Sequence, residues 1–181
     1  MLVKDSVIGK IIEVEGGYVD DPSDSGGKTK YGITEAVARN SGYEGDMRDL
    51  PYELAFEIYA DQYWNPLHLD DIVEIAPDIA EELCDTAVNM GVGRAAEFLQ
   101  TALNVLNRVE KDYDDLSVDS SIGPATLRAF DKFIGFRGPD GELVLVRMLN
   151  SLQGAFYVKL ALDREKDEKF IFGWFLNRVV I

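Results

Sequence analysis

Residues 15–34 read EGGYVDDPSDSGGKTKYGIT, and the expected fold is organised around this stretch. It follows an apolar segment that we predict to be a helix, beginning near Asp5 or Ser6 and ending at Gly16. The glycines at 16 and 17 allow the left-handed residue with which many helices end. The aspartates, serines, glycines and proline that follow are typical of consecutive tight turns, and a small hairpin is expected among them.

Glu15 is the candidate for chemistry in this stretch. Since a helix turns by about 100° per residue, Glu15 projects onto the same face as the apolar side chains before it, whereas Glu13 points the opposite way. Desolvation disfavours a charged carboxylate, so an acid on an apolar face keeps its proton more readily, as general acid catalysis requires. The alternative is that Glu15, in the last turn, reaches solvent or caps the glycine turn. The apolar residues of this face are Val7, Ile8, Ile11 and Ile12.

The order of short motifs resembles the family 108 glycoside hydrolases, which are phage endolysins and related bacterial N-acetylmuramidases of lysozyme-like type. The resemblance implies that Glu15 is the essential catalytic acid. It also implies an all-α, lysozyme-like fold with a small loop or β-hairpin region after the first helix. The motifs that carry the resemblance are Glu15-Gly16-Gly17-Tyr18, Asp21-Pro22, Gly26-Gly27 and Tyr31-Gly32-Ile33-Thr34.

The resemblance further implies hydrolysis of the β-1,4 bond between N-acetylmuramic acid and N-acetylglucosamine in peptidoglycan. Glu15 would protonate the leaving oxygen while an oxocarbenium-like transition state develops. In the wider phage-lysozyme pattern an Asp follows the Glu after eight intervening residues, which favours Asp24 as the second carboxylate. Thr29, one residue earlier than the Thr of that pattern, would help to place water. Asp20 and Asp21 remain alternatives to Asp24.

Aromatic residues are the candidates for substrate binding, because aromatic rings stack on the apolar faces of sugars. Tyr18 and Tyr31 flank the glycine-rich loop and are favoured by their position. Tyr63 and Trp64 end a predicted helix, and a Tyr-Trp pair at such a place is also familiar from the family. Core packing is the alternative for Trp64, since it is the commoner role of aromatic residues at helical spacing.

The remainder of the chain is predicted to be helical, with a catalytic part over residues 1–90 and a second part over 91–181 packed into the same globule. A short helix follows Thr34, and Pro51 fits the first position of the next helix. The last helix is too short to cross a bilayer and is expected to pack as a closing helix. The longer helices are expected at residues 51–64, 77–90, 93–108, 124–133, 142–163 and 170–178, with a loop at 135–141.

The motifs between residues 85 and 127 resemble the predicted peptidoglycan-binding segment that follows the catalytic part in this family. Where the family often has Asp-Gly, this chain has Asp119-Ser120. The leucines of the segment occupy ordinary core positions. We therefore expect it to be mainly a structural half of one helical enzyme, and whether it also binds glycan stays open.

The composition excludes several classes of protein. The chain has 33 acidic and 18 basic residues and a net charge of −15, which argues against binding to nucleic acid or to an anionic membrane through a basic surface. With Cys84 as the one cysteine and His68 as the one histidine, a papain-like cysteine amidase and a zinc amidase are both disfavoured. Cys84 is expected in the core. The acidic loops do not match the helix-loop-helix calcium pattern, so no metal and no cofactor is expected.

Peptidoglycan glycan strands are the expected partner of a monomeric enzyme. The charged residues among the first ten argue against a signal peptide or a membrane anchor there. The resemblance to phage endolysins implies synthesis in the host cytoplasm, exit through a holin lesion and action in the periplasm or cell wall. A lytic transglycosylase and a non-catalytic protein for wall binding or secretion remain alternatives.

Overall fold

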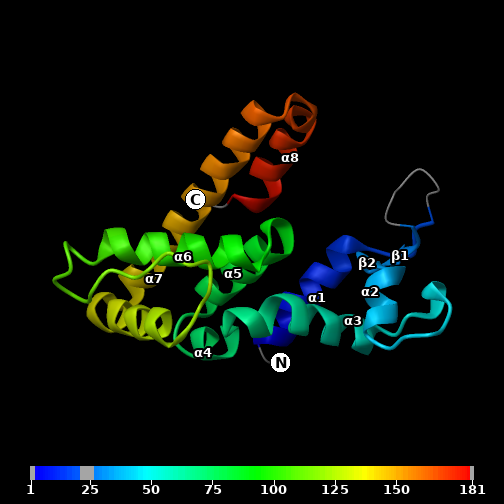
Figure 1. The fold of residues 1–181 in the computed structure, drawn as a ribbon, viewed down its shortest axis with the longest axis horizontal. Coiled ribbons are helices and arrows are strands. Elements are labelled where there is room, and N and C mark those ends of the chain that lie inside the picture. Colours follow the sequence, from blue (N-terminus) through cyan, green and yellow to red (C-terminus); the bar gives the residue numbers. More distant parts are fainter. Residues whose placement is uncertain (1–2, 21–26, 180–181) are drawn as a thin grey trace. The chain divides into compact units, whose positions relative to one another are not determined.

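The computed structural model describes residues 3–20 and 27–179 and is 74% helical, with eight α-helices and a two-stranded sheet in that part of the chain (Figure 1). The expectation of a mainly α, lysozyme-like fold with a small hairpin after the first helix is confirmed. The chain forms two compact units, Met1–Asn65 and Pro66–Ile181. The division expected after residue 90 follows sequence motifs and not compactness, and it stays a prediction.

Helix α1, Val3–Glu15, opens the first unit and begins slightly before the predicted Asp5 or Ser6. Its buried side chains are Val7, Ile8 and Ile12, which is the apolar face expected from helical spacing. The helix ends at Gly16, whose φ of 83° lies in the left-handed region that glycine adopts without strain. The glycine therefore sets the place where α1 stops.

A short antiparallel hairpin follows, made of β1, Thr29–Lys30, and β2, Ile33–Thr34. Its turn residues, Tyr31 and Gly32, have φ of 56° and 72°, so both are left-handed, as in the type I′ turns that suit tight hairpins. The Thr34 side chain then accepts a hydrogen bond from the Val37 backbone and caps the short helix α2, Glu35–Asn40. Both the hairpin and α2 were predicted.

The last helical segment of the first unit changes its winding along its length. After a 3₁₀ turn, η1 (Met47–Asp49), Pro51 caps α3, Tyr52–Tyr59, and so lies one position before the predicted one. The helix continues to Trp64 as predicted, but its last turn, η2 (Ala60–Trp64), is a π-helix. The 3₁₀ turn η3, Asn65–Leu67, follows.

The second unit begins with α4, Leu69–Val73, which the sequence analysis did not predict. Helix α5, Pro77–Met90, has the predicted bounds, and α6, Val92–Leu106, lies within two residues of them. These helices pack together with α7 around a core that contains Ile79, Leu83, Cys84, Leu99, Leu103, Leu145 and Leu149, all buried. The expected burial of Cys84 is confirmed.

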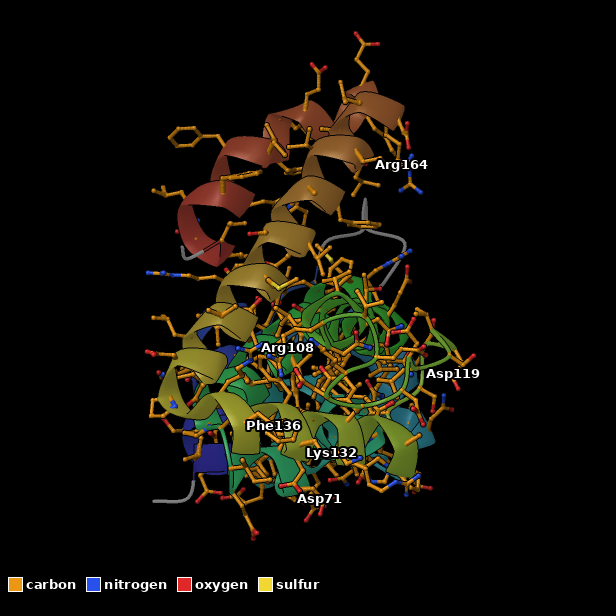
Figure 2. All side chains as sticks on the ribbon, turned by 90° about the vertical axis from the view of Figure 1, so that its left-hand side faces the viewer. Asp71, Arg108, Asp119, Lys132, Phe136 and Arg164 are labelled. Atoms are coloured by element: carbon orange, nitrogen blue, oxygen red, sulfur yellow. The ribbon has the colours of Figure 1, made fainter. Side chains whose placement is uncertain are left out.

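Helix α7, Pro124–Asp163, consists of two helices that meet inside the predicted loop at 135–141, so the break is where it was expected but is shorter than a loop of seven residues. The helix is interrupted there by a kink at Gly138, whose φ of 57° and ψ of −147° are not helical. Pro139 lacks a backbone N–H and cannot continue the hydrogen-bond ladder, so a kink at this point has a clear cause. The part that carries Lys132 and Phe136 and the part that ends before Arg164 run in different directions (Figure 2).

The chain closes with η4, Glu165–Asp167, and α8, Glu168–Arg178. The Trp174 ring stacks on that of Tyr157 in α7, with centroids 4.7 Å apart. The expected packing is nevertheless only partial, since α8 has no buried residue and leaves Phe172 and Leu176 largely exposed. Within the described ranges no helix combines the length and apolar character needed to span a membrane.

Gln100 on α6 organises the acidic loop between α6 and α7. Its buried amide nitrogen donates to Asp119 Oδ1 at 2.8 Å and to the Ser121 carbonyl oxygen at 2.9 Å. Its oxygen accepts from the Asp119 and Ser120 backbones, each at 3.1 Å. Ser120 takes a left-handed φ of 63°, so the Gln100 side chain holds a backbone conformation that serine adopts at some cost.

We expect Gln100→Leu to lower the free energy of unfolding by about 3 kcal/mol, because several buried hydrogen bonds would lose their partner. Urea unfolding followed by circular dichroism measures this loss. The matched control is Gln62→Leu at an exposed position of the first unit, with an expected change within about 0.5 kcal/mol. Equal losses in the two variants would contradict the role given to Gln100.

Candidate active site

The hairpin turn is fastened to the end of α1 by the backbone. The Tyr31 N–H donates to the Gly16 carbonyl oxygen at 3.0 Å, and the Gly16 N–H donates back to Ile12 at 3.3 Å. A further antiparallel bridge joins Val19 to Thr29, with both hydrogen bonds at 2.9 Å. The segment that leaves α1 and the hairpin that returns are thus held side by side, which brings the two turn residues to Glu15.

Glu15 lies directly beside the turn. A Cβ added to Gly32 would lie 3.0 Å from Glu15 Oε2, 3.0 Å from Glu15 Cβ and 2.8 Å from the Tyr59 hydroxyl oxygen. Glycine is therefore required here for two reasons, the left-handed φ and the close approach of two side chains. The last residue of α1, one strand turn and α3 meet at this point.

Glu15 is exposed, which agrees with the alternative that this last-turn residue reaches solvent and not with a place on the buried apolar face. The helical spacing predicted the correct face of α1, because Val7, Ile8 and Ile12 are all buried. Glu15 follows one turn later, at the last residue of the helix, where the buried face has ended. The case for Glu15 as an acid therefore rests on its neighbours and on its access to a large substrate, and not on desolvation by burial.

Tyr59 is the buried neighbour of this carboxylate, with 5% of its surface exposed. Its hydroxyl group donates to the Tyr31 carbonyl oxygen at 3.0 Å, and this hydrogen bond holds the turn against α3. Burial raises the pKa of Tyr59 above its ordinary value, and the negative charge of Glu15 raises it further. The phenol is thus kept neutral and able to donate its hydrogen bond.

The candidates for the second carboxylate are only partly placed. Asp24 and Asp21 lie outside the described residues. Asp20 is described and exposed, and its Oδ2 accepts a hydrogen bond from the Tyr18 hydroxyl group at 3.1 Å. Thr29 lies in β1, half-buried, with its backbone paired to Val19. The assignments of Asp24 and Thr29 stay predictions.

The aromatic candidates fall into two groups. Tyr18 and Tyr31 are half-exposed near the turn, with Arg48 4.8 Å from the centroid of the Tyr18 ring and Lys30 5.0 Å from that of Tyr31. Trp64 has 0% of its surface exposed, so its ring packs in the core and offers no face to a sugar. The packing alternative holds for this residue.

Tyr63 is partly exposed, like Tyr18 and Tyr31 and unlike Trp64. It is half-buried, and its ring centroid is 5.6 Å from that of Tyr59, which connects it to the group around Glu15. A substrate-binding role for Tyr63 stays a prediction.

Sequence reasoning did not assign roles to Tyr59, Gly32 as a close contact, or the cations beside the turn. The Lys30 ammonium group donates to the Arg48 carbonyl oxygen at 2.6 Å, so strand β1 and η1 are linked at this place. Spacing along α3 could identify a face that contains Tyr59, but the partner of that face depends on the return of the hairpin. No local sequence signal tells how close the hairpin comes to Tyr59.

Comparison with known proteins gives matches over both parts of the chain. Residues 8–91 match the family model of glycosyl hydrolase 108, and residues 94–179 match that of a predicted peptidoglycan domain. These are the families and the order expected from the motifs, so the family resemblance seen in the sequence is confirmed. No curated protein matches the chain.

Among solved structures, that of Brucella abortus SagA is similar to this chain. The two are 26% identical, with a TM-score of 0.65, and the match covers 94% of this chain and 86% of the other. The likeness therefore extends through both compact units.

Gly32→Ala tests the close contact at the turn. Both Gly32 and Gly42 have a left-handed φ, 72° and 84°, so alanine at either position costs about 1–2 kcal/mol of backbone strain. A Cβ at Gly42 meets nothing within 4 Å, whereas one at Gly32 meets Glu15 and Tyr59. Urea unfolding should therefore show a larger loss of stability for Gly32→Ala than for the control Gly42→Ala. Similar losses would mean that the contact is relaxed in solution.

Proposed function

We propose that this chain, whose residues 8–91 match the family model of glycosyl hydrolase 108 and which is a glycosidase that acts on peptidoglycan, is a muramidase. It would hydrolyse the β-1,4 bond between N-acetylmuramic acid and N-acetylglucosamine. The observation that supports this most is the position of Glu15, exposed at the end of α1 beside a hairpin turn that backbone hydrogen bonds fasten to the same helix end.

In the proposed mechanism, Glu15 donates its proton to the leaving glycosidic oxygen as an oxocarbenium-like transition state develops. A long glycan strand can reach this carboxyl group because it is exposed. Tyr59 positions the site: its neutral hydroxyl group holds the Tyr31 carbonyl, and its buried ring supports the turn from α3. Gly32 leaves the space that Glu15 and Tyr59 occupy.

A second carboxylate would complete the reaction, as base for water or as a stabiliser of the transition state. We propose Asp24 for this role, with Thr29 helping to place the water and with Asp20 and Asp21 as the alternative carboxylates. The hydrogen bond from Tyr18 to Asp20 supports a structural role for Asp20, since it ties one side chain of the loop to another. Asp24 is therefore preferred over Asp20 as the partner of Glu15, and Asp21 stays an alternative.

The rings of Tyr18 and Tyr31 are the proposed platforms for sugar, because they are half-exposed beside the turn. Arg48 and Lys30 lie over these rings and provide local positive charge in a chain whose net charge is −15. Local attraction of this kind would help an anionic wall polymer to reach an otherwise acidic protein.

The biological setting that we propose is phage-mediated lysis. The enzyme would be an endolysin, made in the host cytoplasm, passing through a holin lesion and acting as a monomer on the wall. The motif resemblance described above supports this setting.

Glu15→Gln should lower the rate of peptidoglycan hydrolysis by about 10²–10⁴-fold, because the amide cannot donate a proton to the leaving oxygen. Loss of turbidity of purified peptidoglycan measures the rate. Glu13→Gln is the matched control, since Glu13 is an exposed glutamate on the same helix, and it should retain full activity. A fully active Glu15→Gln protein would refute the proposed acid.

Asp24→Asn separates hydrolysis from the transglycosylase alternative. A hydrolase that uses Asp24 should lose about 100-fold in rate, whereas a lytic transglycosylase needs no base for water and should change little. Mass spectrometry of the wild-type products gives the second readout: reducing N-acetylmuramic acid ends indicate hydrolysis, and anhydro ends indicate transglycosylation. Asp49→Asn, at an exposed position, is the control, and a loss in Asp20→Asn instead would move the role to Asp20.

A further inference from the structure

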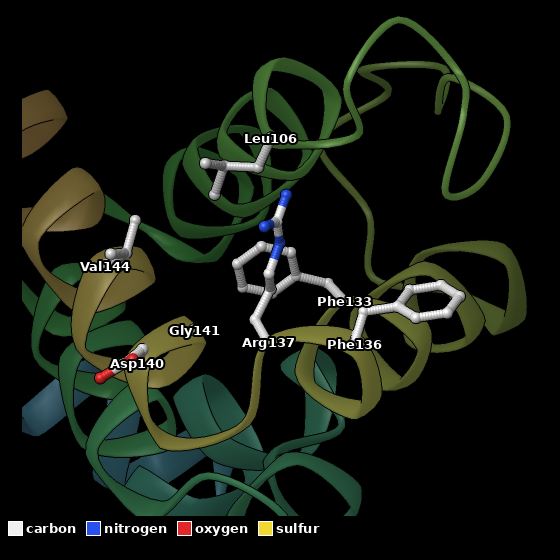
Figure 3. A pocket seen from close by; sticks show the side chains of 7 residues that line it. All are labelled: Leu106, Phe133, Phe136, Arg137, Asp140, Gly141 and Val144. Carbon is white, nitrogen blue, oxygen red and sulfur yellow. The ribbon is translucent and has the colours of Figure 1, made fainter.

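A pocket of about 460 Å³ lies in the second unit at the kink of α7 (Figure 3). This volume is within the range of small-molecule sites in proteins. The pocket combines apolar walls with one cation and one carboxylate. It is lined by Leu106, Phe133, Phe136, Arg137, Asp140, Gly141 and Val144.

The kink builds the pocket. After the non-helical Gly138, α7 turns back so closely that a Cβ at Gly141 would collide with Arg137 Cβ and lie 3.4 Å from Phe133 Cε1. Glycine at 141 therefore lets the stem of Arg137 pass over the second part of the helix. The guanidinium group then rises between Phe133 and Leu106, across the middle of the pocket (Figure 3).

Arg137 has donors to spare for a ligand. Among the described residues, its charged neighbour is Asp112, at 3.8 Å, and 40% of the Arg137 side chain is exposed. Asp112 already receives two hydrogen bonds from Arg108, and these, before any other effect, lower the pKa of its carboxyl group. Since Arg108 largely satisfies Asp112, the planar guanidinium of Arg137 can bind a second carboxylate.

The remaining lining residues restrict the ligand. Phe133 is buried and forms the apolar base, whereas Phe136 has 63% of its surface exposed at one side of the pocket. Asp140 lies on the other side, with its carboxylate directed away from Arg137 (Figure 3). A fitting ligand therefore carries a carboxylate next to small apolar groups, with room for an amine near Asp140.

We propose that this pocket binds the peptide stem of peptidoglycan, an assignment that rests on peptidoglycan being the substrate of the enzyme. Arg137 holds a carboxylate of the stem, and the apolar walls hold its alanine methyl groups. Asp140 accepts a hydrogen bond from the protonated free amine of a diamino acid. The match of this half of the chain to a predicted peptidoglycan domain supports the polymer, and the lining residues select the peptide over the sugar.

The test is binding to soluble muropeptides with the full chain carrying Glu15→Gln, so that the ligand is not consumed. Calorimetry compares a disaccharide-tetrapeptide with the same disaccharide lacking its peptide. Adding Arg137→Gln should weaken binding of the disaccharide-tetrapeptide by about 10-fold or more, because a charge-assisted hydrogen bond is lost. Arg147→Gln, at an exposed arginine on the same helix, should leave the affinity unchanged.

Phe136→Ala provides a second test that does not touch an ion pair, and Phe172→Ala, also largely exposed, is its control. Unchanged affinity in both Arg137→Gln and Phe136→Ala overturns the proposal. Equal weakening for the disaccharide without peptide also overturns it and assigns the pocket to sugar. The hydrolysis assay on Glu15→Gln is a separate experiment. Unchanged muropeptide binding would overturn the pocket proposal and leave the muramidase proposal standing, and full activity of Glu15→Gln would overturn the proposed acid without deciding what the pocket binds.

Discussion

The hydrogen bond from the Tyr31 N–H to the Gly16 carbonyl oxygen connects everything that meets at the candidate site. It joins a helix end to a hairpin turn, and neither element alone would place a second group beside Glu15. Tyr59 then supports the turn from α3 through its own bond to the Tyr31 carbonyl. The site is thus a junction of three short segments, in which backbone groups hold the helix end to the hairpin and the Tyr59 side chain holds α3 to the turn.

The second unit contains irregular backbone between its long helices, and particular residues stabilise it. Gln100 gives the acidic loop after α6 a buried partner for several polar groups. At Gly138 a kink keeps both parts of α7 helical and leaves a pocket between them. The buried amide of Gln100 stabilises the irregular loop, and Gly138 adopts the non-helical conformation of the kink without strain.

Much of the fold could be predicted from sequence, because periodicity and helix caps are local signals. The bounds of α5, the buried face of α1 and the capping of α2 by Thr34 all follow from such signals. The exposure of Glu15 was one of two alternatives that the sequence could not decide between, since helical spacing gives a direction and not where the buried face ends. The burial of Trp64 depends on long-range packing, and a Gly-Pro pair signals a break without distinguishing a loop from the kink at Gly138.

Tyr31 occupies a left-handed position that asparagine or glycine would adopt at lower cost, and it does so beside the candidate acid. The protein therefore tolerates local strain at the position of a proposed sugar-binding ring. Thermal selection or consensus-based stabilisation would tend to replace this tyrosine first, since the backbone gain there is immediate. If Tyr31 binds sugar as proposed, resistance to heat and substrate binding are opposed at this position, which makes the hairpin a poor target for stabilising the protein.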